Sequence, residues 1–315
     1  MTSTSLLRRA LDLAANGIGQ VFKGPYVGWV LTQHGQIQQE GWLEGEKHLS
    51  DCFSAYHPQP NQTLFLNTNP FANPAALESF CRKYAIKQYY LATDNPALSS
   101  TEYHLNHRYY TWQQQKRPYI ILKWAQTADS FIARSNYDAR WISNPLSRKL
   151  VHQWRAEEAA IWAGKNTYQH DNPRLNVRDW TGSDPVRIII DKNLSLNPTW
   201  HVFDQAQPTL CYNFVKNETN RNLEYVKLVA DEHDWSAIIT CVLDDLYQRS
   251  VQSVFVEGGA VLLNFLIQKN LWDEARVFQS LQTFGQGIPA PVINEKYAHF
   301  TTNIDRDRLT CYRRT

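Results

Sequence analysis

Residues 254–264 carry the pattern best suited to holding a phosphorylated ligand. A short apolar run ends at Glu257, the pair Gly258-Gly259 follows, and a second apolar run begins at Ala260. Glycines let a ligand approach the backbone closely, and the N–H groups at the start of a following helix suit a diphosphate. The segment lacks the GxGxxG fingerprint of dinucleotide-binding folds. The spacing fits equally well a tight strand-to-helix turn that needs glycine only for its shape.

Two arginines, Arg155 and Arg178, form a second candidate. Between them an apolar segment ends at Gly164 and gives way to a polar loop rich in Asp, Asn and Arg. Two guanidinium groups could form a bidentate phosphate clamp if the fold brings them together. The spacing alone favours a plainer interpretation, a solvated loop with surface arginines.

The composition is that of a globular protein acting on small molecules. The 315 residues include 32 Lys and Arg against 30 Asp and Glu, and 43% are hydrophobic, which excludes disorder and argues against a general nucleic-acid binder. No apolar run reaches the length of a membrane span or of a signal peptide. The five cysteines are too scattered for disulfide or metal motifs. We therefore expect free thiols and a cytoplasmic protein without membrane or nucleic-acid partners.

The first half of the chain is predicted to be a compact α/β unit. Hydrophobic periods predict helices over residues 5–16 and 75–84 and strands over residues 27–32, 36–42, 63–67 and 87–92. Residues 95–118 show no period and are predicted to be a polar linker. We expect two domains, residues 1–116 and 117–315.

The second half alternates strands with helices, which predicts a largely parallel sheet with both faces covered. A helix is predicted from Asn144-Pro145, a good N-terminal cap, to about Trp162. The remaining predicted helices span residues 235–250 and 260–269. The predicted strands span residues 119–125, 186–191, 209–214, 225–230 and 253–257.

This second half resembles the reductase domain of the bifunctional riboflavin-biosynthesis deaminase–reductase family, a domain of dihydrofolate-reductase-like fold. The order and spacing of the matching segments hold over nearly all of residues 118–290. Those segments are residues 117–123, 128–129, 140–143, 155–156, 164–167, 171–178, 256–259 and 271–274.

The resemblance implies a reduction that uses NADPH and assigns the residues of the site. Lys123, Asp171 and Glu257 are expected to be catalytic, with Lys123 either facing the pocket to polarise the sugar or leaving it at the strand end. Substrate contacts are expected from Ala139, Arg155, Leu175, Arg178 and Glu257. Cofactor contacts are expected from Gln126, Trp141, Thr167, Asp171, Gly258, Gly259, Ala260, Val261, Leu262, Leu263, Asn264 and Phe265.

Three departures from the family pattern fall near this site. Asp129-Ser130 replaces an Asp-Gly, which is tolerated only if the backbone there avoids positive φ. Ala139 replaces a serine, and Asn172 replaces the second carboxylate of an Asp-Asp-Pro. The main groups of the implied site are otherwise present.

The first half resembles the family's deaminase domain, of cytidine-deaminase-like α/β/α fold, on residues 24–28, the hairpin and Gly41-Trp42. Such a domain holds zinc with one His and two Cys and moves a proton with a Glu. Here His48 remains, Ser50 replaces the Glu, and Phe71 and Leu77 replace the cysteines, with Cys81 a helical turn further on. We predict no zinc and no deaminase activity. Trp42, Phe53, Tyr56 and Phe71 are expected to fill the lost metal pocket, which requires them to be buried.

Together these resemblances imply NADPH-dependent reduction of the ribosylamino group of 5-amino-6-(5-phosphoribosylamino)uracil to the ribitylamino product. Reduction of the 2,5-diaminopyrimidine before deamination is an alternative, as is reduction of another phosphoribosyl or pteridine substrate. A different class of function is a non-catalytic partner of an active deaminase–reductase. The resemblance also implies a homodimer.

Overall fold

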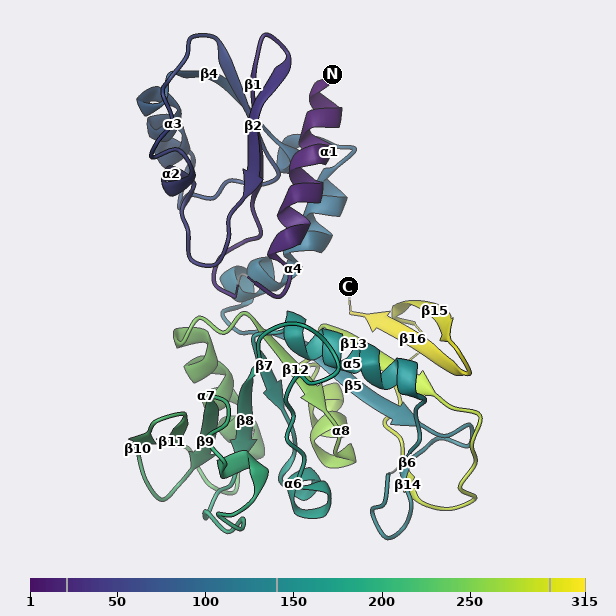
Figure 1. The fold of residues 1–315 in the computed structure, drawn as a ribbon. Helices are drawn as coiled ribbons and strands as arrows, with labels where there is room; N and C mark the ends of the chain where they lie inside the picture. The colour runs from purple at the N-terminus through teal and green to yellow at the C-terminus, as the bar shows by residue number, and fades with distance from the viewer. Residues whose placement is uncertain (21, 140, 295, 315) are drawn as a thin grey trace. The chain divides into compact units, whose positions relative to one another are not determined.

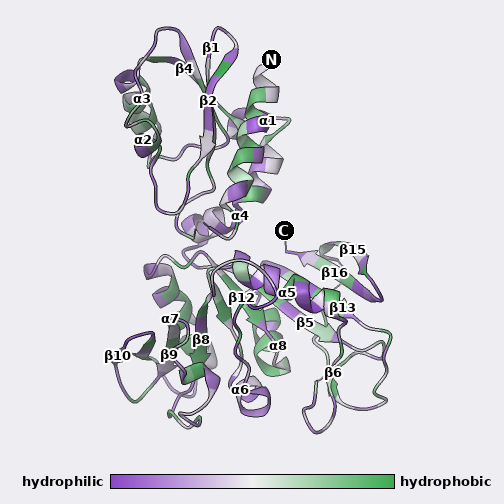
Figure 2. Ribbon diagram, in the orientation of Figure 1, coloured by the Kyte–Doolittle hydropathy of each residue, from purple (hydrophilic) through white to green (hydrophobic). Residues whose placement is uncertain are grey.

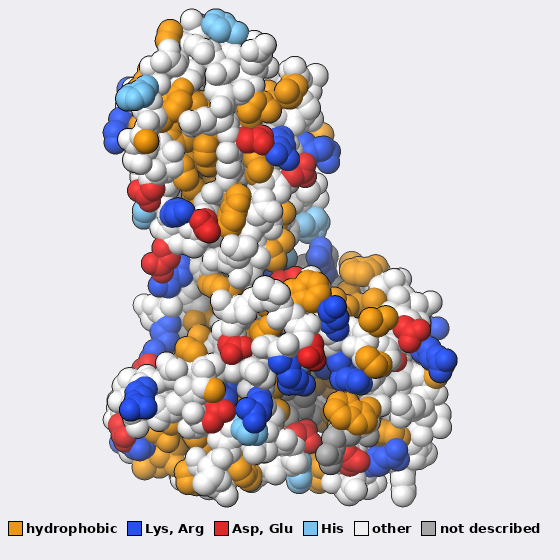
Figure 3. Space-filling model, viewed as in Figure 1, with side chains coloured by type: hydrophobic (Ala, Val, Ile, Leu, Met, Phe, Trp, Pro, Cys, Tyr) orange, Lys and Arg blue, Asp and Glu red, His pale blue; other side chains and the backbone are white. Residues whose placement is uncertain are grey.

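The computed structural model describes residues 1–20, 22–139, 141–294 and 296–314. The chain divides into two compact units, Met1–Gln115 and Lys116–Thr315, here called unit 1 and unit 2 (Figure 1). Arg140, within one of the matching segments, lies outside the described residues. In the described part of the chain, no helix is both long and apolar enough to cross a membrane. On the face seen in Figure 3, basic and acidic side chains are interspersed over each unit.

Unit 1 is a four-stranded sheet with helices on both faces, in the strand order β2-β1-β3-β4. Neighbouring residues of a strand point to opposite faces, so Val30 packs with helix α1 whereas Trp29 and Leu31 pack with α3. Strands β3 and β4 are parallel, and β1 is antiparallel to both of its neighbours. The elements are α1 (Ser3–Ala14), η1 (Ala15–Gly17), β1 (Gly28–Gln33), β2 (Gln36–Trp42), α2 (Leu49–Cys52), β3 (Gln62–Leu66), α3 (Pro74–Lys83), β4 (Ile86–Leu91), η2 (Ala92–Asp94) and α4 (Ser99–Gln115).

Helix α4 occupies most of the segment that we predicted to be a linker. The prediction was wrong because the buried face of this helix is polar: Glu102 and Asn106 are each 1% exposed, so no apolar period marks the helix. Figure 2 shows α4 mainly in the hydrophilic colour. The Tyr110 hydroxyl donates to both carboxylate oxygens of Glu102 at 2.9 Å, and the Asn106 amide donates to the same carboxylate at 2.8 Å. Hydrogen bonds among buried polar groups take the place of a hydrophobic stripe.

Unit 2 is built on a ten-stranded sheet in the order β10-β11-β9-β8-β7-β12-β5-β13-β16-β15. All pairs from β11 through β13 are parallel and the pairs at the two edges are antiparallel, which confirms the largely parallel sheet. A separate pair is formed by β6 (Phe131–Ala133) and β14 (Ile288–Pro289). The strands of the large sheet are β5 (Tyr119–Gln126), β7 (Ala160–Trp162), β8 (Val186–Ile190), β9 (Thr209–Asn213), β10 (Glu218–Asn220), β11 (Leu223–Lys227), β12 (Ser253–Glu257), β13 (Glu274–Gln279), β15 (Ala298–Ile304) and β16 (Asp307–Arg313).

The two faces of this sheet bury two separate cores. On β5, Ile120 and Leu122 pack with helices α7 and α8, whereas Ile121 packs with α5 and α6. The central strands are therefore apolar on both faces, as a covered parallel sheet requires. Figure 2 shows α8 largely in the hydrophobic colour. The helices are α5 (Pro145–Glu157), α6 (Lys165–Asp171), η3 (His201–Phe203), α7 (Trp235–Gln248) and α8 (Ala260–Gln268).

One local expectation in unit 2 was wrong, and one condition stated for its sequence is not met. The helix that starts at the predicted Asn144 cap ends at Glu157, because the apolar residues after it form the buried strand β7. A short apolar run fits a buried strand and a buried helix end equally well. The condition set for a serine at position 130, a backbone without positive φ, is not met: its φ is +64°, a left-handed conformation that costs a residue with a side chain about 1 kcal/mol.

Candidate active site

Unit 2 contains a cavity of about 1100 Å³ at the carboxyl ends of its central parallel strands. Residues at or just beyond the ends of β7, β8 and β12 line the cavity, together with residues of β5. Ligands of α/β sheets bind at this edge, because loops and helix starts from several strands converge there. Helices α5, α6 and α8 supply further wall residues.

Three charged side chains meet at this cavity: Lys123 from β5, Arg155 from α5 and Glu257 at the end of β12. Arg155 binds Glu257 as a fork, with Nε 2.5 Å from Oε1 and Nη2 3.0 Å from Oε2. Lys123 Nζ lies 3.8 Å from Glu257 Oε2. Lys123 and Glu257 are partners in the β5–β12 register, so the sheet itself places them side by side. No side chain of the three is more than 15% exposed.

The surroundings of these groups set their charge states. Burial lowers the pKa of Lys123; Glu257 opposes this shift, and Arg155 adds to it. Burial by itself raises the pKa of Glu257, but the charges of Arg155 and Lys123 outweigh it and hold that pKa below its ordinary value. Glu257 is therefore a carboxylate, and Lys123 is the member of the group best placed to give up a proton.

The Gly258-Gly259 turn brings the start of α8 to the cavity wall. The two glycines have φ of +73° and +77°, which residues with side chains rarely adopt. A Cβ on Gly259 would lie 3.2 Å from Thr167 Oγ1 of α6, so the turn and that helix approach closely. Helix α8 has no side-chain cap, which leaves its first N–H groups for other acceptors. The glycine pair therefore forms a tight turn and also lets a ligand come close to the uncapped start of α8.

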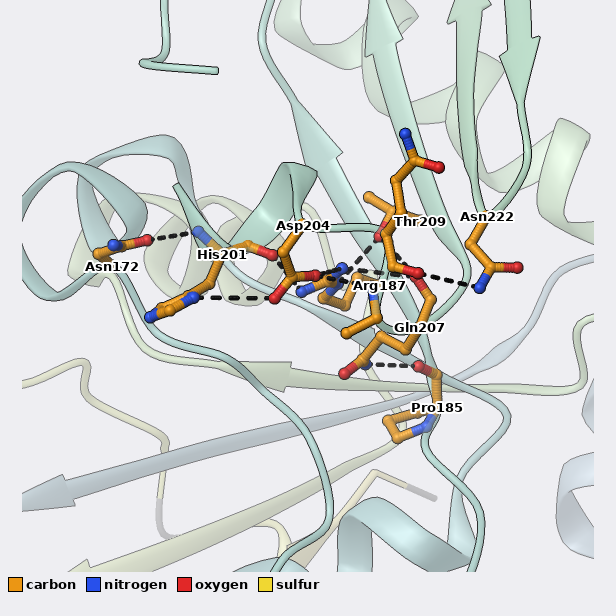
Figure 4. A network of polar contacts seen from close by, with 10 residues as sticks. Asn172, Pro185, Arg187, His201, Asp204, Gln207, Thr209 and Asn222 are labelled. Atoms are coloured by element: carbon orange, nitrogen blue, oxygen red, sulfur yellow. Dashed lines mark hydrogen bonds and ion pairs between the residues drawn. The ribbon is translucent and has the colours of Figure 1, made fainter. Parts of the chain in front are cut away.

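The end of α6 forms another part of the wall, at Asp171. The next residue, Asn172, is left-handed with φ of +40°, and its side-chain oxygen accepts the His201 N–H at 2.8 Å. The His201 carbonyl in turn accepts a hydrogen bond from Arg187, a fully buried residue of β8 that also binds Asp204 (Figure 4). A buried arginine on the sheet thereby holds the loop that fixes the chain next to Asp171.

Unfavourable backbone and stacked aromatic rings also occur along the cavity. Tyr137 and Leu175 line it with φ of +68° and +54°. Bulky residues hold such conformations only where the surrounding packing enforces them, often at functional sites. The Tyr137 ring stacks on His170 at 4.1 Å, and the Arg148 guanidinium lies 4.6 Å from the Trp141 ring centre.

Most of the residues predicted for the site line this one cavity. Lys123, for which two orientations were open, faces it. The roles assigned to individual residues remain predictions. The predicted residues that line the cavity are Lys123, Ala139, Trp141, Arg155, Thr167, Asp171, Leu175, Arg178, Glu257, Gly258, Gly259, Ala260, Val261, Leu262 and Phe265.

Three predicted cofactor contacts lie elsewhere. Leu263 is fully buried in the core, because it sits on the inward face of α8, and Asn264 beside it is not part of the cavity wall. The Gln126 side chain accepts a hydrogen bond from Trp124 Nε1 at 2.8 Å and lines a second cavity of about 190 Å³. The carry-over from the family followed the chain position, whereas in the fold these three residues do not line the large cavity.

The phosphate clamp considered for Arg155 and Arg178 is not formed as a pair. Arg155 directs Nε and Nη2 to Glu257 and Nη1 to the Asn176 carbonyl, at 3.0 Å. Arg178 is 54% exposed and has its Nε 3.8 Å from Asp179. Arg178 is therefore the arginine of the two that can turn its guanidinium to a ligand.

The polar wall residues that sequence reasoning missed include His152 and Lys165. His152 lies three positions before Arg155 on α5, a spacing that puts both on one face of the helix, and this was the available signal. Lys165 follows Gly164 at the start of α6 and bonds to Asp191 at 2.8 Å. Its signal was weaker, because a lysine at a helix start is usually a solvated surface group.

In unit 1, the two residues that stand where a zinc deaminase has its cysteines are packed in an apolar core. Phe71 and Leu77 pack in one apolar core around Phe53, which is fully buried. Trp42 lies in another cluster, with Tyr26, so the expectation that it fills the same pocket was wrong. The rings whose centres lie 5.0–5.5 Å from that of Phe53 belong to Trp29, Tyr56, Phe80 and Tyr84.

The polar residues of this region do not fit a zinc ion. Cys81 is buried in the apolar core around Phe53, and burial raises the pKa of its thiol to about 11. His48 is exposed at the start of α2. In residues 1–20, 22–139, 141–294 and 296–314, no three His, Cys, Asp or Glu residues lie together as a metal site.

The chain is similar to proteins of riboflavin biosynthesis in sequence and in fold. A sequence model of the RibD C-terminal domain matches residues 118–299. The riboflavin biosynthesis protein RibD of Aquifex aeolicus is 28% identical over 320 residues, which cover 90% of this chain and 88% of that protein. The crystal structure of a diaminohydroxyphosphoribosylaminopyrimidine deaminase/5-amino-6-(5-phosphoribosylamino)uracil reductase from Thermotoga maritima superposes with a TM-score of 0.83 at 23% identity, covering 99% of this chain and 98% of that one. Acinetobacter baumannii RibD superposes with a TM-score of 0.80 at 19% identity and covers 99% of both chains. The two structural likenesses show that the whole chain has the α/β fold of those proteins.

Proposed function

Because this chain belongs to the RibD C-terminal domain family, we propose that unit 2 is an NADPH-dependent reductase of a phosphoribosylamino-pyrimidine. Family membership supports an oxidoreductase of riboflavin biosynthesis. The observation that carries the finer proposal is the buried group of Lys123, Arg155 and Glu257 in one cavity with the Gly258-Gly259 turn. The substrate we propose is 5-amino-6-(5-phosphoribosylamino)uracil, whose ribosylamino group becomes a ribitylamino group.

The cavity wall suits a nicotinamide dinucleotide. The Gly258-Gly259 backbone has no Cβ atoms to keep a diphosphate away, and the uncapped start of α8 offers it N–H donors. A volume of about 1100 Å³ is at the upper end of small-molecule sites, which leaves room for a second, smaller ligand. When bound, NADPH supplies the hydride. Trp141, Thr167 and Asp171 are the wall residues that we assign to its remaining contacts.

The residues of the chain orient the opened sugar and supply a proton. Reduction turns the C1′=N double bond of the opened sugar into a single bond, and its nitrogen must gain a proton. We assign that proton to Lys123 Nζ, because burial favours its release there. Glu257 fixes Lys123 and can accept hydrogen bonds from sugar hydroxyls, and Arg178 is the proposed partner of the phosphate.

We further propose that unit 1 is a cytidine-deaminase-like domain that has lost its metal and its activity, and that unit 2 is dihydrofolate-reductase-like. The whole-chain likeness to the Thermotoga protein supports a deaminase-type origin of unit 1. The apolar packing of Phe71 and Leu77 supports the loss. A separate deaminase would then act in the same cell. Metal analysis and a deaminase assay test this proposal: about one zinc per chain together with deaminase turnover would refute it.

The decisive experiment follows NADPH oxidation by the full chain with each of two pyrimidines, the uracil compound and its 2,5-diamino precursor. We expect turnover of the uracil compound. Turnover of the precursor alone would place reduction before deamination. NADPH binding without either turnover would point to another substrate, and the absence of NADPH binding would favour a non-catalytic partner. Repeating the assay with NADH measures the cofactor preference.

A matched pair of variants tests the role of Lys123. We expect Lys123→Met to abolish turnover while NADPH affinity is kept, because the variant lacks the proton held at Nζ. Lys227→Met, at an exposed position of β11, is the control and should turn over normally. Full turnover by Lys123→Met would show that Lys123 does not supply the proton.

A further inference from the structure

His152 is a buried titratable side chain of the cavity to which the proposed reaction gives no part. Its side chain is 3% exposed and lines the cavity from α5. Burial and the charges of Arg155 and Arg178 lower the pKa of His152 to about 4. The ring is therefore neutral near pH 7, and a neutral imidazole can accept at one nitrogen and donate at the other.

Both ring nitrogens of His152 face the loop that carries Arg178. Nδ1 accepts the backbone N–H of Arg178 at 3.4 Å, so the proton of the neutral ring is on Nε2. Nε2 lies 3.4 Å from Asp179 Oδ2, and that same oxygen lies 3.8 Å from Arg178 Nε. His152 thereby holds the backbone of Arg178 by a hydrogen bond, and its Nε2 shares the neighbouring Asp179 carboxylate with the Arg178 guanidinium.

The same face of α5 docks the rest of this loop. Arg155 Nη1 donates to the Asn176 carbonyl at 3.0 Å. A Cβ on Gly182 would lie only 2.6 Å from the Ala156 Cβ, so the loop backbone touches the helix there. Positions 152, 155 and 156 are spaced i, i+3 and i+4, which places them on one side of a helix. The loop is fixed at three points, and His152 is the one next to Arg178.

Arg178 depends on such a support to bind an anion well. Its side chain is 54% exposed, and a long exposed side chain loses rotational freedom when it binds a ligand. Holding the backbone of an arginine in advance reduces that loss and helps to orient its planar donor fork. Without the support, the same charge would bind a phosphate less tightly.

We propose that His152 is the positioning residue of a phosphate subsite formed by Arg178, and that the ligand of this subsite is a sugar phosphate. The inference rests on the proposed function, in which the substrate carries a ribose 5-phosphate. It adds that the affinity of the subsite depends on a hydrogen bond from the Arg178 backbone to His152.

The test measures the affinity of the full chain for ribose 5-phosphate and for ribose by calorimetry, which requires no turnover. We expect His152→Leu to weaken ribose 5-phosphate binding about five- to tenfold, the loss of its hydrogen bond to the Arg178 backbone, and to leave ribose binding unchanged. His152→Asn places an amide oxygen near the position of Nδ1 and should stay within about threefold of the native affinity. His152→Gln, whose amide lies further along the side chain, should bind as weakly as the leucine variant. Thermal unfolding shows whether each variant folds. If the leucine variant does not fold, the comparison of the asparagine and glutamine variants still tests the inference.

A double-mutant cycle with Arg178→Ala shows whether His152 acts through Arg178. We expect Arg178→Ala to lower the affinity for ribose 5-phosphate and His152→Gln to add no further loss in that background. NADPH affinity should be the same in all variants. Equal binding by the Asn and Gln variants, additive losses, or equal native affinities for ribose and ribose 5-phosphate would each overturn the inference. Failure of the proposed function is recognised separately, as native phosphate binding without reduction of either pyrimidine.

Discussion

Units 1 and 2 are both sheets covered by helices on two faces, yet they bury opposite kinds of side chain where a deaminase–reductase would do its chemistry. Unit 2 holds Lys123, Arg155 and Glu257 almost out of water. Unit 1 holds a cluster of aromatic rings around Phe53. Taking charges out of water is costly and packing rings is favourable, so a buried charged group is the stronger sign of a retained function. The proposed function accounts for this difference, because it keeps chemistry in unit 2 and removes it from unit 1.

The largest effect is expected from removing the negative charge of Glu257, which holds the buried charged group of unit 2 together. Glu257→Gln leaves Arg155 and Lys123 buried without their carboxylate, which should lower the free energy of unfolding by about 3–5 kcal/mol. Reductase turnover should fall with it, because both positive groups lose their position. Chemical unfolding and NADPH oxidation measure the two effects.

Glu102→Gln in unit 1 is the matched control. Glu102 is also buried, but its side chain is held by the neutral donors Asn106 and Tyr110, and burial raises its pKa. An amide can replace most of these contacts, so we expect a loss of about 1–2 kcal/mol and no effect on reductase turnover. Equal losses in the two variants would mean that the charged group of unit 2 is ordinary packing.

The aromatic cluster gives the next effect. Phe53→Ala removes the ring at its centre and should lower the free energy of unfolding by about 3–4 kcal/mol, the usual cost of emptying such a core position. Phe53→Leu, which keeps much of the volume, should cost about 1–1.5 kcal/mol. Chemical unfolding followed by tyrosine and tryptophan fluorescence measures both. A loss below about 1 kcal/mol for the alanine variant would show that the cluster does not stabilise unit 1.

The parts of the site that could be predicted are those that a short stretch of sequence encodes. Apolar runs predicted strands β5 and β12, and the glycine pair after Glu257 predicted a turn at the carboxyl end of β12. Parallel strands bring such ends to one edge, so the convergence of the site residues followed from the fold class. Helix periodicity could also have excluded Leu263, which lies on the apolar face of α8.

The parts that could not be predicted depend on contacts across the chain. Arg155 and Glu257 are 102 positions apart, and no local pattern shows that they form a fork rather than leaving Arg155 for a phosphate. Helix α4 was missed because its buried side is polar and satisfied by hydrogen bonds, for example between Glu102 and Tyr110. Sequence periodicity registers hydrophobic burial and is blind to both kinds of interaction.

A smaller loss of stability is expected when the pH is lowered, because His152 is buried in its neutral form. The pKa of His152 is about 4 in the folded chain against an ordinary 6.5, so between these values the unfolded chain binds more protons. The stability that His152 contributes is present above pH 6.5 and is lost as the pH falls toward 4, by up to about 1.4 kcal/mol per pH unit. Burial is the largest cause of this lowered pKa, the charges of Arg155 and Arg178 add to it, and those of Asp179 and Glu257 oppose it.

The measurement compares the free energies of unfolding of the native chain and of His152→Asn between pH 7 and pH 4.5. The advantage of the native chain should shrink as the pH falls. Glu102 of unit 1 acts in the opposite direction, because its raised pKa makes the folded chain bind more protons and so favours folding at lower pH. A difference between the two chains that stays constant with pH would mean that His152 titrates normally.

The smallest effect concerns backbone strain, which the two units share. Ser130 in unit 2 and Ala85 in unit 1 have φ of +64° and +53°, where glycine is favoured. Ser130→Gly and Ala85→Gly should each raise the free energy of unfolding by about 0.5–1 kcal/mol, because relief of the left-handed strain outweighs the extra freedom of glycine in the unfolded chain. Thermal unfolding measures the gain, and NADPH oxidation should be unchanged in both variants. Loss of turnover in Ser130→Gly alone would show that the strained backbone at this position serves the reaction. If both variants gain the same free energy of unfolding and Ser130→Gly keeps its turnover, backbone strain does not distinguish the two units. The buried charges then remain the feature that does.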